Sequence, residues 1–119
     1  MNAEEIIKLK KNALYTSLES KDFFGKFFNK SMLHYAVIME VFSKNNFDGI
    51  SYEKLCSNVP KVLGSRSSIQ NLLNEGLDKK ILKKIESEKD KRIKNYYLSD
   101  EFSGLVIDWL KKQKSIFNR

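Results

Sequence analysis

The chain has 119 residues, of which 41% are hydrophobic and 31% charged, and its formal net charge at neutral pH is +7. This length and composition favour one packed domain over residues 1–119. One cysteine excludes an internal disulfide and a cysteine-based zinc cluster, one histidine excludes a catalytic histidine pair, and no apolar run approaches the length of a membrane-spanning helix.

Charge and the start of the chain also bear on partners and location. The acidic first residues have no long apolar run behind them and do not resemble a signal peptide, so we expect a cytoplasmic protein that does not contact a membrane. The basic isoelectric point, near 9.4, favours a polyanionic partner, with nucleic acid ahead of a membrane surface.

Two helices are predicted within residues 1–30, a segment that could serve dimerisation. Residues 3–18 carry an apolar stripe opposite a row of lysines. The stripe consists of Ile6, Ile7, Ala13, Leu14 and Leu18. Residues 22–28 contain four phenylalanines at positions 23, 24, 27 and 28. Their spacing gives a broad aromatic face, which could be a core plug, a dimer interface or the wall of a ligand pocket.

Residues 31–44 form the most apolar predicted helix, which we expect to be central and largely buried because apolar residues occupy nearly all its sides. His34 lies within it. We interpret His34 as a packed or half-exposed residue and not as a metal ligand or a catalytic base, because no second metal-type residue is near it in the sequence.

Residues 50–52 favour a short strand that leads into a helix over residues 52–58, with Ser51 as its N-cap and Pro60 as its stop. Leu55, Cys56 and Val59 are expected to face the core. A redox-sensing thiol is the alternative for Cys56, and it would require exposure and a lowered pKa.

The next helix begins after Ser65, a good N-cap. Its apolar stripe consists of Ile69, Leu72, Leu73 and Leu77, and its opposite face carries Ser67, Gln70, Asn71, Asn74 and Asp78. Amide side chains offer a donor and an acceptor together, which suits adenine edges in the major groove. Arg66, in the first turn, could reach a guanine edge or a phosphate. The alternative is an ordinary solvent face.

A basic hairpin follows, with strands over residues 81–85 and 92–98. Leu82 and Ile85 are expected to anchor the first strand, and Ile93, Tyr96, Tyr97 and Leu98 fall in the second. Residues 79–94 contain eight basic and three acidic side chains. A basic loop beside an amide-faced helix is typical of a wing that lies along DNA phosphates with its tip at the minor groove. The alternative is a solvated edge hairpin whose lysines oppose aggregation.

The last predicted helix covers residues 100–119, with Ser99 as N-cap and acidic residues in its first turn. Its stripe is Phe102, Leu105, Val106, Trp109 and Leu110. This helix could bury its stripe within the chain or against a second copy. Trp109 is the side chain most expected at a packed interface.

Residues 90–99 resemble the wing signature of the MarR family of bacterial winged-helix regulators. The signature is Asp-x-Arg, five residues, then Leu-Thr or Leu-Ser opening the next helix, and residues 90–99 read DKRIKNYYLS. The resemblance covers roughly residues 30–110. It implies that Arg92 enters the minor groove with Asp90 helping to hold it. It also aligns Leu55-Cys56 with a Leu-Ala pair of the family, which favours a buried Cys56.

The sequence departs from the family's pattern in three places. The connection from Leu55 to Ile69 is about three residues longer, Ile81 stands where the family has a glycine after its recognition helix, and the C-terminal helix ends early. Gly76 would lie inside the helix, at a cost of about 1 kcal/mol relative to alanine. We expect these departures to alter the bases contacted and to reduce or rearrange a dimer interface built from both termini.

We therefore predict a mainly α-helical winged helix-turn-helix protein with a small β-hairpin wing. It would be a homodimer that binds double-stranded DNA and regulates transcription, most often as a repressor, with its two units about one helical turn, roughly 34 Å, apart. The predicted DNA-contacting residues are Ser65, Arg66, Ser67, Gln70, Asn71, Asn74, Lys83, Lys84, Lys89, Lys91, Arg92 and Lys94.

No catalysis, metal or cofactor is expected, because the sequence has no nucleophile–base pair, metal cluster or phosphate-cradling glycine loop. Whether a small-molecule effector acts is left open. The alternative function is a winged helix used for protein contact or assembly without DNA sequence preference. In that case Gln70, Asn71 and Arg92 could be replaced without loss of the partner.

Overall fold

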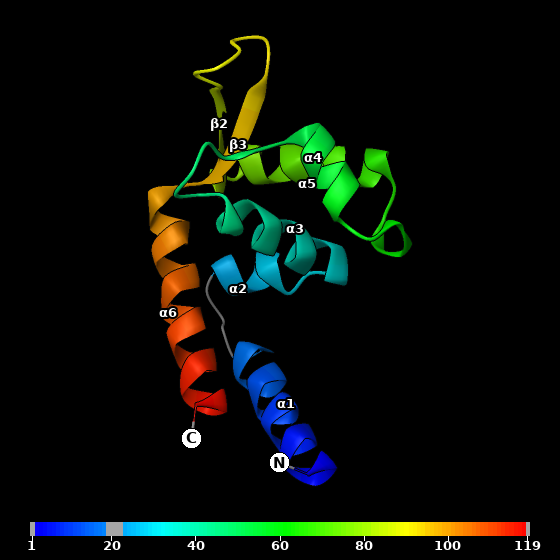
Figure 1. Cartoon of the computed structure of the whole chain (residues 1–119), viewed down its shortest axis with the longest axis vertical. Helices are drawn as coiled ribbons and strands as arrows, with labels where there is room; N and C mark the ends of the chain where they lie inside the picture. The colour runs from blue at the N-terminus through cyan, green and yellow to red at the C-terminus, as the bar shows by residue number, and fades with distance from the viewer. Residues whose placement is uncertain (1, 19–22, 119) are drawn as a thin grey trace.

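The computed structural model describes residues 2–18 and 23–118. Its elements, in chain order, are α1 Ala3–Leu18, α2 Phe23–Phe28, α3 Met32–Ser43, β1 Ile50–Ser51, α4 Tyr52–Asn58, the short 3-10 helix η1 Lys61–Leu63, α5 Arg66–Asp78, β2 Leu82–Glu86, β3 Lys94–Leu98 and α6 Asp100–Phe117. The predicted class, mainly α-helical with a small hairpin, is confirmed (Figure 1).

Helix α3 is the centre of the hydrophobic core, as its apolar sequence predicts. Val37, Ile38 and Val41 are fully buried, and they cluster with Leu55 of α4 and Leu73 of α5. In Figure 1, α3 lies between α2 on one side and the α4–α5 pair on the other. Ser31 caps α3 by accepting a hydrogen bond from the His34 amide at 3.1 Å. The core therefore fixes α4 and α5 to one central helix.

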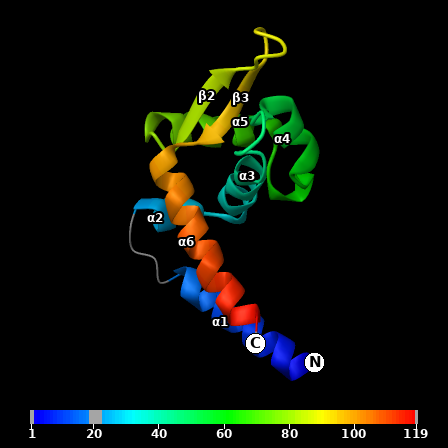
Figure 2. The same cartoon turned by 60° about the vertical axis from the view of Figure 1, so that its left-hand side comes forward.

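The three strands form an antiparallel sheet in the order β1-β3-β2. Leu82, Tyr96 and Leu98 share the face that packs on the core. Two hairpin predictions are wrong: Ile85 is 46% exposed and anchors nothing, and Ile93 lies before β3 and is 45% exposed. The hairpin extends past the body, so its outer positions have no core to cover (Figures 1 and 2).

Helix α5 ends in a left-handed turn and packs closely on β2. Lys80 has φ 62°, so a lysine takes the conformation that usually favours glycine. A Cβ built on Gly76 would lie 2.6 Å from Cδ1 of Leu82, which gives this buried glycine a packing role inside the helix. That role accounts for a glycine at a helical position where alanine would otherwise be favoured.

Helices α1 and α6 lie side by side and project away from the body (Figures 1 and 2), and Nε2 of Gln113 donates to the Ala13 carbonyl at 3.0 Å. The bounds predicted for α1 are confirmed, but its predicted buried stripe is not. Leu9 and Ser17 are buried, whereas Ile7, Leu14 and Leu18 are more than half exposed. The cause is that α1 reaches beyond the body and contacts mainly α6.

The aromatic residues of the α2–α3 corner join the body to α6. Phe27 and Phe28 are buried, which confirms the core-plug interpretation for these two, while the side chains of Phe23 and Phe24 lie outside the described residues. The Phe28 ring lies 5.1 Å from Trp109, so Trp109 packs within the chain. Leu110, at the end of the predicted α6 stripe, is 37% exposed.

Three smaller expectations have mixed outcomes. Ser51 caps α4 as predicted, accepting from the Lys54 amide at 3.2 Å. Ser99 occupies the N-cap position of α6, but its side chain makes no capping bond. Cys56 packs against the core yet is only half-buried, because α4 covers the body's edge. Within the described ranges, no helix is long and apolar enough to cross a membrane.

Candidate nucleic-acid interface

The polar face of α5 is open to solvent over most of its length. Ser67, Asn71 and Asn74 are exposed, and half-buried Gln70 donates from Nε2 to Oδ1 of Asn74 at 3.0 Å. Ser65 accepts from the Ser68 amide at 3.1 Å, so its hydroxyl is used as the N-cap. The face therefore offers amide and hydroxyl groups that can pair with base edges.

Arg66, the first residue of α5, is held by two residues of α4. Its Nη2 lies 2.5 Å from Oε1 of Glu53, and its guanidinium lies over the Tyr52 ring at 5.2 Å. The Tyr52 hydroxyl donates to the Arg66 carbonyl at 3.0 Å. The hydrogen bond to Glu53 raises the pKa of Arg66. These contacts orient the guanidinium before any partner arrives, and neither Glu53 nor Tyr52 was among the predicted site residues.

The tip of the hairpin carries a second arginine–carboxylate pair. Arg92 donates from Nε and Nη2 to the two carboxylate oxygens of Asp90, both at 3.1 Å. This pairing lowers the pKa of Asp90. Lys89 and Lys91 are exposed beside it. The contact that the wing resemblance implies between Asp90 and Arg92 is therefore present.

The basic residues of the hairpin strands divide between its two faces, because successive side chains of a strand point to opposite sides. Lys84 lies over the Tyr96 ring at 5.5 Å and shares a face with Lys94 and with Leu82, whose side chain contacts α5. Lys83 is on the other face and pairs with Asp100 of α6 at 3.5 Å. The sequence analysis grouped Lys83 and Lys84 together as DNA contacts, whereas the alternation of side chains along β2 places them on opposite faces.

The hairpin is held by residues before β1 that are not among the predicted site residues. Nδ2 of Asn95 donates to the Asp48 carbonyl at 2.7 Å, and the Ser87 hydroxyl lies 3.3 Å from an Asp48 carboxylate oxygen. Oδ1 of Asn45 accepts from the Leu98 amide at 2.8 Å. The signal available was the Asn and Asp content of residues 45–48, since these side chains often bond nearby backbone.

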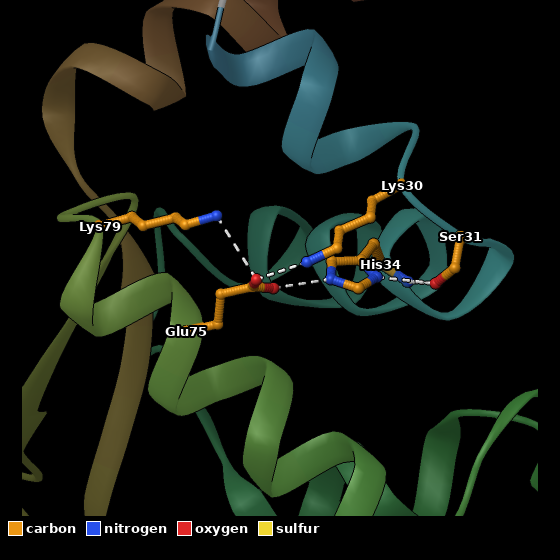
Figure 3. Close-up of polar contacts among 5 residues, drawn as sticks. All are labelled: Lys30, Ser31, His34, Glu75 and Lys79. Atoms are coloured by element: carbon orange, nitrogen blue, oxygen red, sulfur yellow. Dashed lines mark hydrogen bonds and ion pairs between the residues drawn. The ribbon is translucent and has the colours of Figure 1, made fainter.

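On the side of α5 that faces α3, Glu75 gathers three basic groups (Figure 3). One of its carboxylate oxygens lies 2.6 Å from Nζ of Lys30 and 3.4 Å from Nζ of Lys79, and the other lies 2.9 Å from Nε2 of His34. His34 is thus half-buried, as predicted, and its hydrogen bonds to Glu75 and Ser31 were not predicted. Within residues 2–18 and 23–118 no group of three His, Cys, Asp or Glu side chains could hold a metal ion.

The chain matches no family model and no curated protein, but solved structures share its fold. MepR of S. aureus bound to ethidium bromide is 18% identical, with 99% of this chain and 76% of that chain covered and a TM-score of 0.65. The chain has the winged helix-turn-helix fold of MarR-type regulators. A MepR–DNA complex, 16% identical, covers 98% of this chain and 78% of its own at a TM-score of 0.51. YusO from Bacillus subtilis, also 16% identical, covers 98% of this chain and 82% of its own at 0.52.

In winged-helix terms, α4 and α5 are the helix-turn-helix, α5 is the recognition helix, and the β2–β3 hairpin is the wing. The 3-10 helix η1 lies in the turn between α4 and α5, in the connection that the sequence shows to be longer than usual. The wing contacts α5 through Leu82 and Gly76. The recognition helix and the wing are thereby packed directly on each other.

Proposed function

We propose that the protein is a sequence-specific DNA-binding transcriptional regulator that acts in the cytoplasm, as a repressor. The observation that carries this proposal is the exposed amide-rich face of α5 beside a wing whose tip bears Lys89, Lys91 and Arg92. The fold shared with a MepR–DNA complex supports it. No catalytic role is included, and the solved structures of similar fold include regulators such as SlyA.

In this proposal α5 enters the major groove. Gln70, Asn71 and Asn74 supply amide groups to base edges, and Arg66 reaches a guanine or a phosphate at the first turn. Ser67 is exposed beside them, and Ser65 contributes as the helix cap.

The wing would supply the remaining contacts. Lys84 and Lys94 share the hairpin face that packs on α5, and with Lys89 and Lys91 they would neutralise phosphates. Arg92, oriented by Asp90, would probe the minor groove. Lys83 lies on the opposite face and would add only to the long-range positive field.

The test is competition binding of labelled genomic DNA fragments against bulk DNA at two salt concentrations. We expect selective binding that weakens steeply with salt, and loss of selectivity in Arg92→Ala. Lys26→Ala, which removes an exposed cation from α2, is the matched control and should behave as wild type. Weak binding that ignores both sequence and Arg92 would contradict the proposal and favour the protein-contact alternative.

A small-molecule effector is part of the proposal. A cavity of about 600 Å³ lies between α1, the α2–α3 corner and α6. Its lining includes Phe28, Tyr35, Trp109 and Phe117, which suits a flat aromatic molecule. MepR, which shares the fold, has been solved with ethidium bromide. We propose that an aromatic ligand in this cavity alters DNA binding.

We also propose that the protein is a two-fold homodimer formed through α1 and α6. Both helices present large apolar side chains to solvent: Ile6, Ile7, Leu14, Tyr15 and Leu18 on α1, and Ile107, Leu110 and Phe117 on α6. Exposed apolar surface that is contiguous along a projecting helix pair is typical of an interface. A dimer would place two recognition helices on successive turns of one DNA face.

A further inference from the structure

Besides its buried apolar face, the recognition helix makes a polar connection to the scaffold through Glu75. Glu75 belongs to α5 and its partners Lys30 and His34 belong to the α2–α3 corner (Figure 3). The His34–Glu75 and Lys30–Glu75 contacts, at 2.9 and 2.6 Å, join residues that are 41 and 45 positions apart in the sequence. They are therefore tertiary contacts, and they add a polar connection to the apolar packing of Leu72 and Leu73 against the core.

The contact is partly shielded from solvent and keeps Glu75 ionised. Glu75 is only 24% exposed and His34 12%. The hydrogen bond from Lys30, with that from His34, lowers the pKa of Glu75 to about 2. Hydrogen bonds between an ionised carboxylate and a charged donor are stronger than hydrogen bonds between two neutral groups.

The other end of the same chain of contacts reaches the cavity. The Ser31 hydroxyl lies 2.7 Å from Nδ1 of His34, and Ser31 lines the cavity together with Asn29. Lys30 lies between these two lining residues in the sequence and binds Glu75. The wall of the cavity and the carboxylate on the recognition helix are thus separated by a single imidazole ring.

The direction of the hydrogen bonds follows from the chemistry of the groups. An ionised Glu75 can only accept, so Nε2 of His34 must donate to it. In a neutral imidazole Nδ1 is then the acceptor, and the Ser31 hydroxyl donates to it. If an occupant of the cavity accepts the hydrogen bond of the Ser31 hydroxyl, Nδ1 of His34 loses its donor. The hydrogen bond between His34 and Glu75 would then change as well.

We propose that Ser31, His34 and Glu75 are positioning residues that connect the cavity to the recognition helix. An aromatic occupant with a hydrogen-bond acceptor directed at Ser31 shifts α5 through His34 and so changes DNA affinity. This inference rests on the proposed function, because it specifies how occupation of the cavity is transmitted to the DNA-binding face.

The experiment uses anilinonaphthalene sulfonate as the probe, since its rings match the aromatic lining and its sulfonate oxygens can accept from Ser31. Trp109 is the only tryptophan of the chain and lines the cavity, so its fluorescence reports occupation without DNA. Probe affinity is measured with and without the selected DNA fragment. In the wild type we expect DNA to lower the affinity for the probe about tenfold, and the probe to lower the affinity for DNA by the same factor.

Two His34 variants separate linkage from folding. His34→Gln keeps an amide that can donate to Glu75 but has no group in place of Nδ1, so we expect near-normal DNA affinity with the coupling reduced to less than about twofold. His34→Phe keeps an aromatic ring to pack on Phe27, at 4.9 Å, but loses the hydrogen bonds to Glu75 and Ser31. DNA affinity and the coupling between probe and DNA should therefore both fall. Glu101→Gln removes an exposed carboxylate of α6 and should retain the full coupling.

Unchanged coupling in His34→Gln would overturn the proposal, and so would probe binding that quenches Trp109 without affecting DNA, or no quenching at all. If the wild type binds no DNA, the proposed function fails separately. The link is then measured by hydrogen exchange of α5 amides. The link is supported if the probe changes the protection of α5 amides in the wild type but not in His34→Gln. An equal change in the wild type and in His34→Gln would overturn the link.

Discussion

Each arginine of the proposed DNA-binding face is paired with a carboxylate: Arg66 with Glu53, and Arg92 with Asp90. Such pairing reduces the net charge that each guanidinium presents and restricts its orientation. The exposed lysines Lys84, Lys89, Lys91 and Lys94 would then supply most of the salt-dependent affinity. Arg66 and Arg92 are better suited to reading a groove than to general attraction.

This view of Arg66 can be tested with Glu53→Gln. Removing the carboxylate charge should raise affinity for non-specific DNA by about two- to fivefold, corresponding to the loss of a weak surface ion pair. It should also steepen the plot of log affinity against log salt by up to about 0.9, the equivalent of one more phosphate contact. Glu101→Gln, which removes an exposed carboxylate outside α4 and α5, is the control. A slope equal to wild type would exclude a role for Glu53.

Gly76 gives a second prediction. Replacing glycine by alanine in a helix usually stabilises it by about 1 kcal/mol. At position 76 the new Cβ would lie 2.6 Å from the buried Leu82 side chain, so we expect Gly76→Ala to destabilise the protein by about 1–3 kcal/mol in urea unfolding. Gly104→Ala is the matched control in α6, where nothing lies within 4 Å of the new Cβ, and it should stabilise. If both variants changed the free energy of unfolding in the same direction, the packing role of Gly76 would be contradicted.

Among the helices and strands, α5 depends on contacts from both of its sides. The wing packs on it through Leu82 at Gly76, and α3 holds it through His34 at Glu75. The polar face between these contacts remains open. Together with the buried apolar face of α5, these two contacts set the position of the helix, so a change at either one would shift the proposed DNA-binding face.

The Glu75 contact should be visible in the pH dependence of stability. Its pKa in the folded protein is about 2, below the ordinary value of 4.5. The contact therefore stabilises the fold fully above about pH 4.5 and is lost as the pH falls towards 2. We expect Glu75→Gln to be about 1–2 kcal/mol less stable than wild type at pH 7, allowing for partial exposure, with the difference shrinking below pH 4. Urea unfolding at pH 7 and pH 3 measures it, and a constant difference would contradict the assignment.

For the whole molecule, the notable feature is a body with a helix pair projecting from one end and a wing from the other (Figures 1 and 2). The longest extent is 49 Å, against 30 and 25 Å in the other directions. Side chains such as Ile7 and Ile107 are exposed on the projecting pair. Such a shape leaves much apolar surface uncovered in one chain, and a second copy would cover it.

The dimer prediction is tested by Ile7→Glu and Ile107→Glu. If α1 and α6 form the interface, the buried charge should convert the dimer to a monomer and weaken binding to a palindromic site by at least about tenfold. Val62→Glu is the control for the measurement of mass, since Val62 is 92% exposed and lies in η1, outside α1 and α6. Light scattering after gel filtration measures the mass. A dimer that persists in both variants would show that another surface is used.

Local sequence patterns determined most of the elements. Caps such as Ser31, Ser51 and Ser65, and apolar stripes of helical period, predicted α1, α3, α4 and α5 to within a residue or two of their bounds. These signals lie within one or two turns of the backbone, so they do not depend on the rest of the chain. The spacing of Asp90 and Arg92 was enough, with the family resemblance, to predict their contact.

Tertiary structure decided which faces of the helices and strands are buried and which charged side chains form ion pairs. Ile85 and Ile7 read as core residues, but the wing and α1 extend beyond the body and leave both exposed. The contact of Glu75 with Lys30 and His34 joins residues more than 40 positions apart, and only packing decides that the strand face of Lys84, and not that of Lys83, lies against α5. No local pattern specifies such contacts, because they form only when the packed core brings distant segments together.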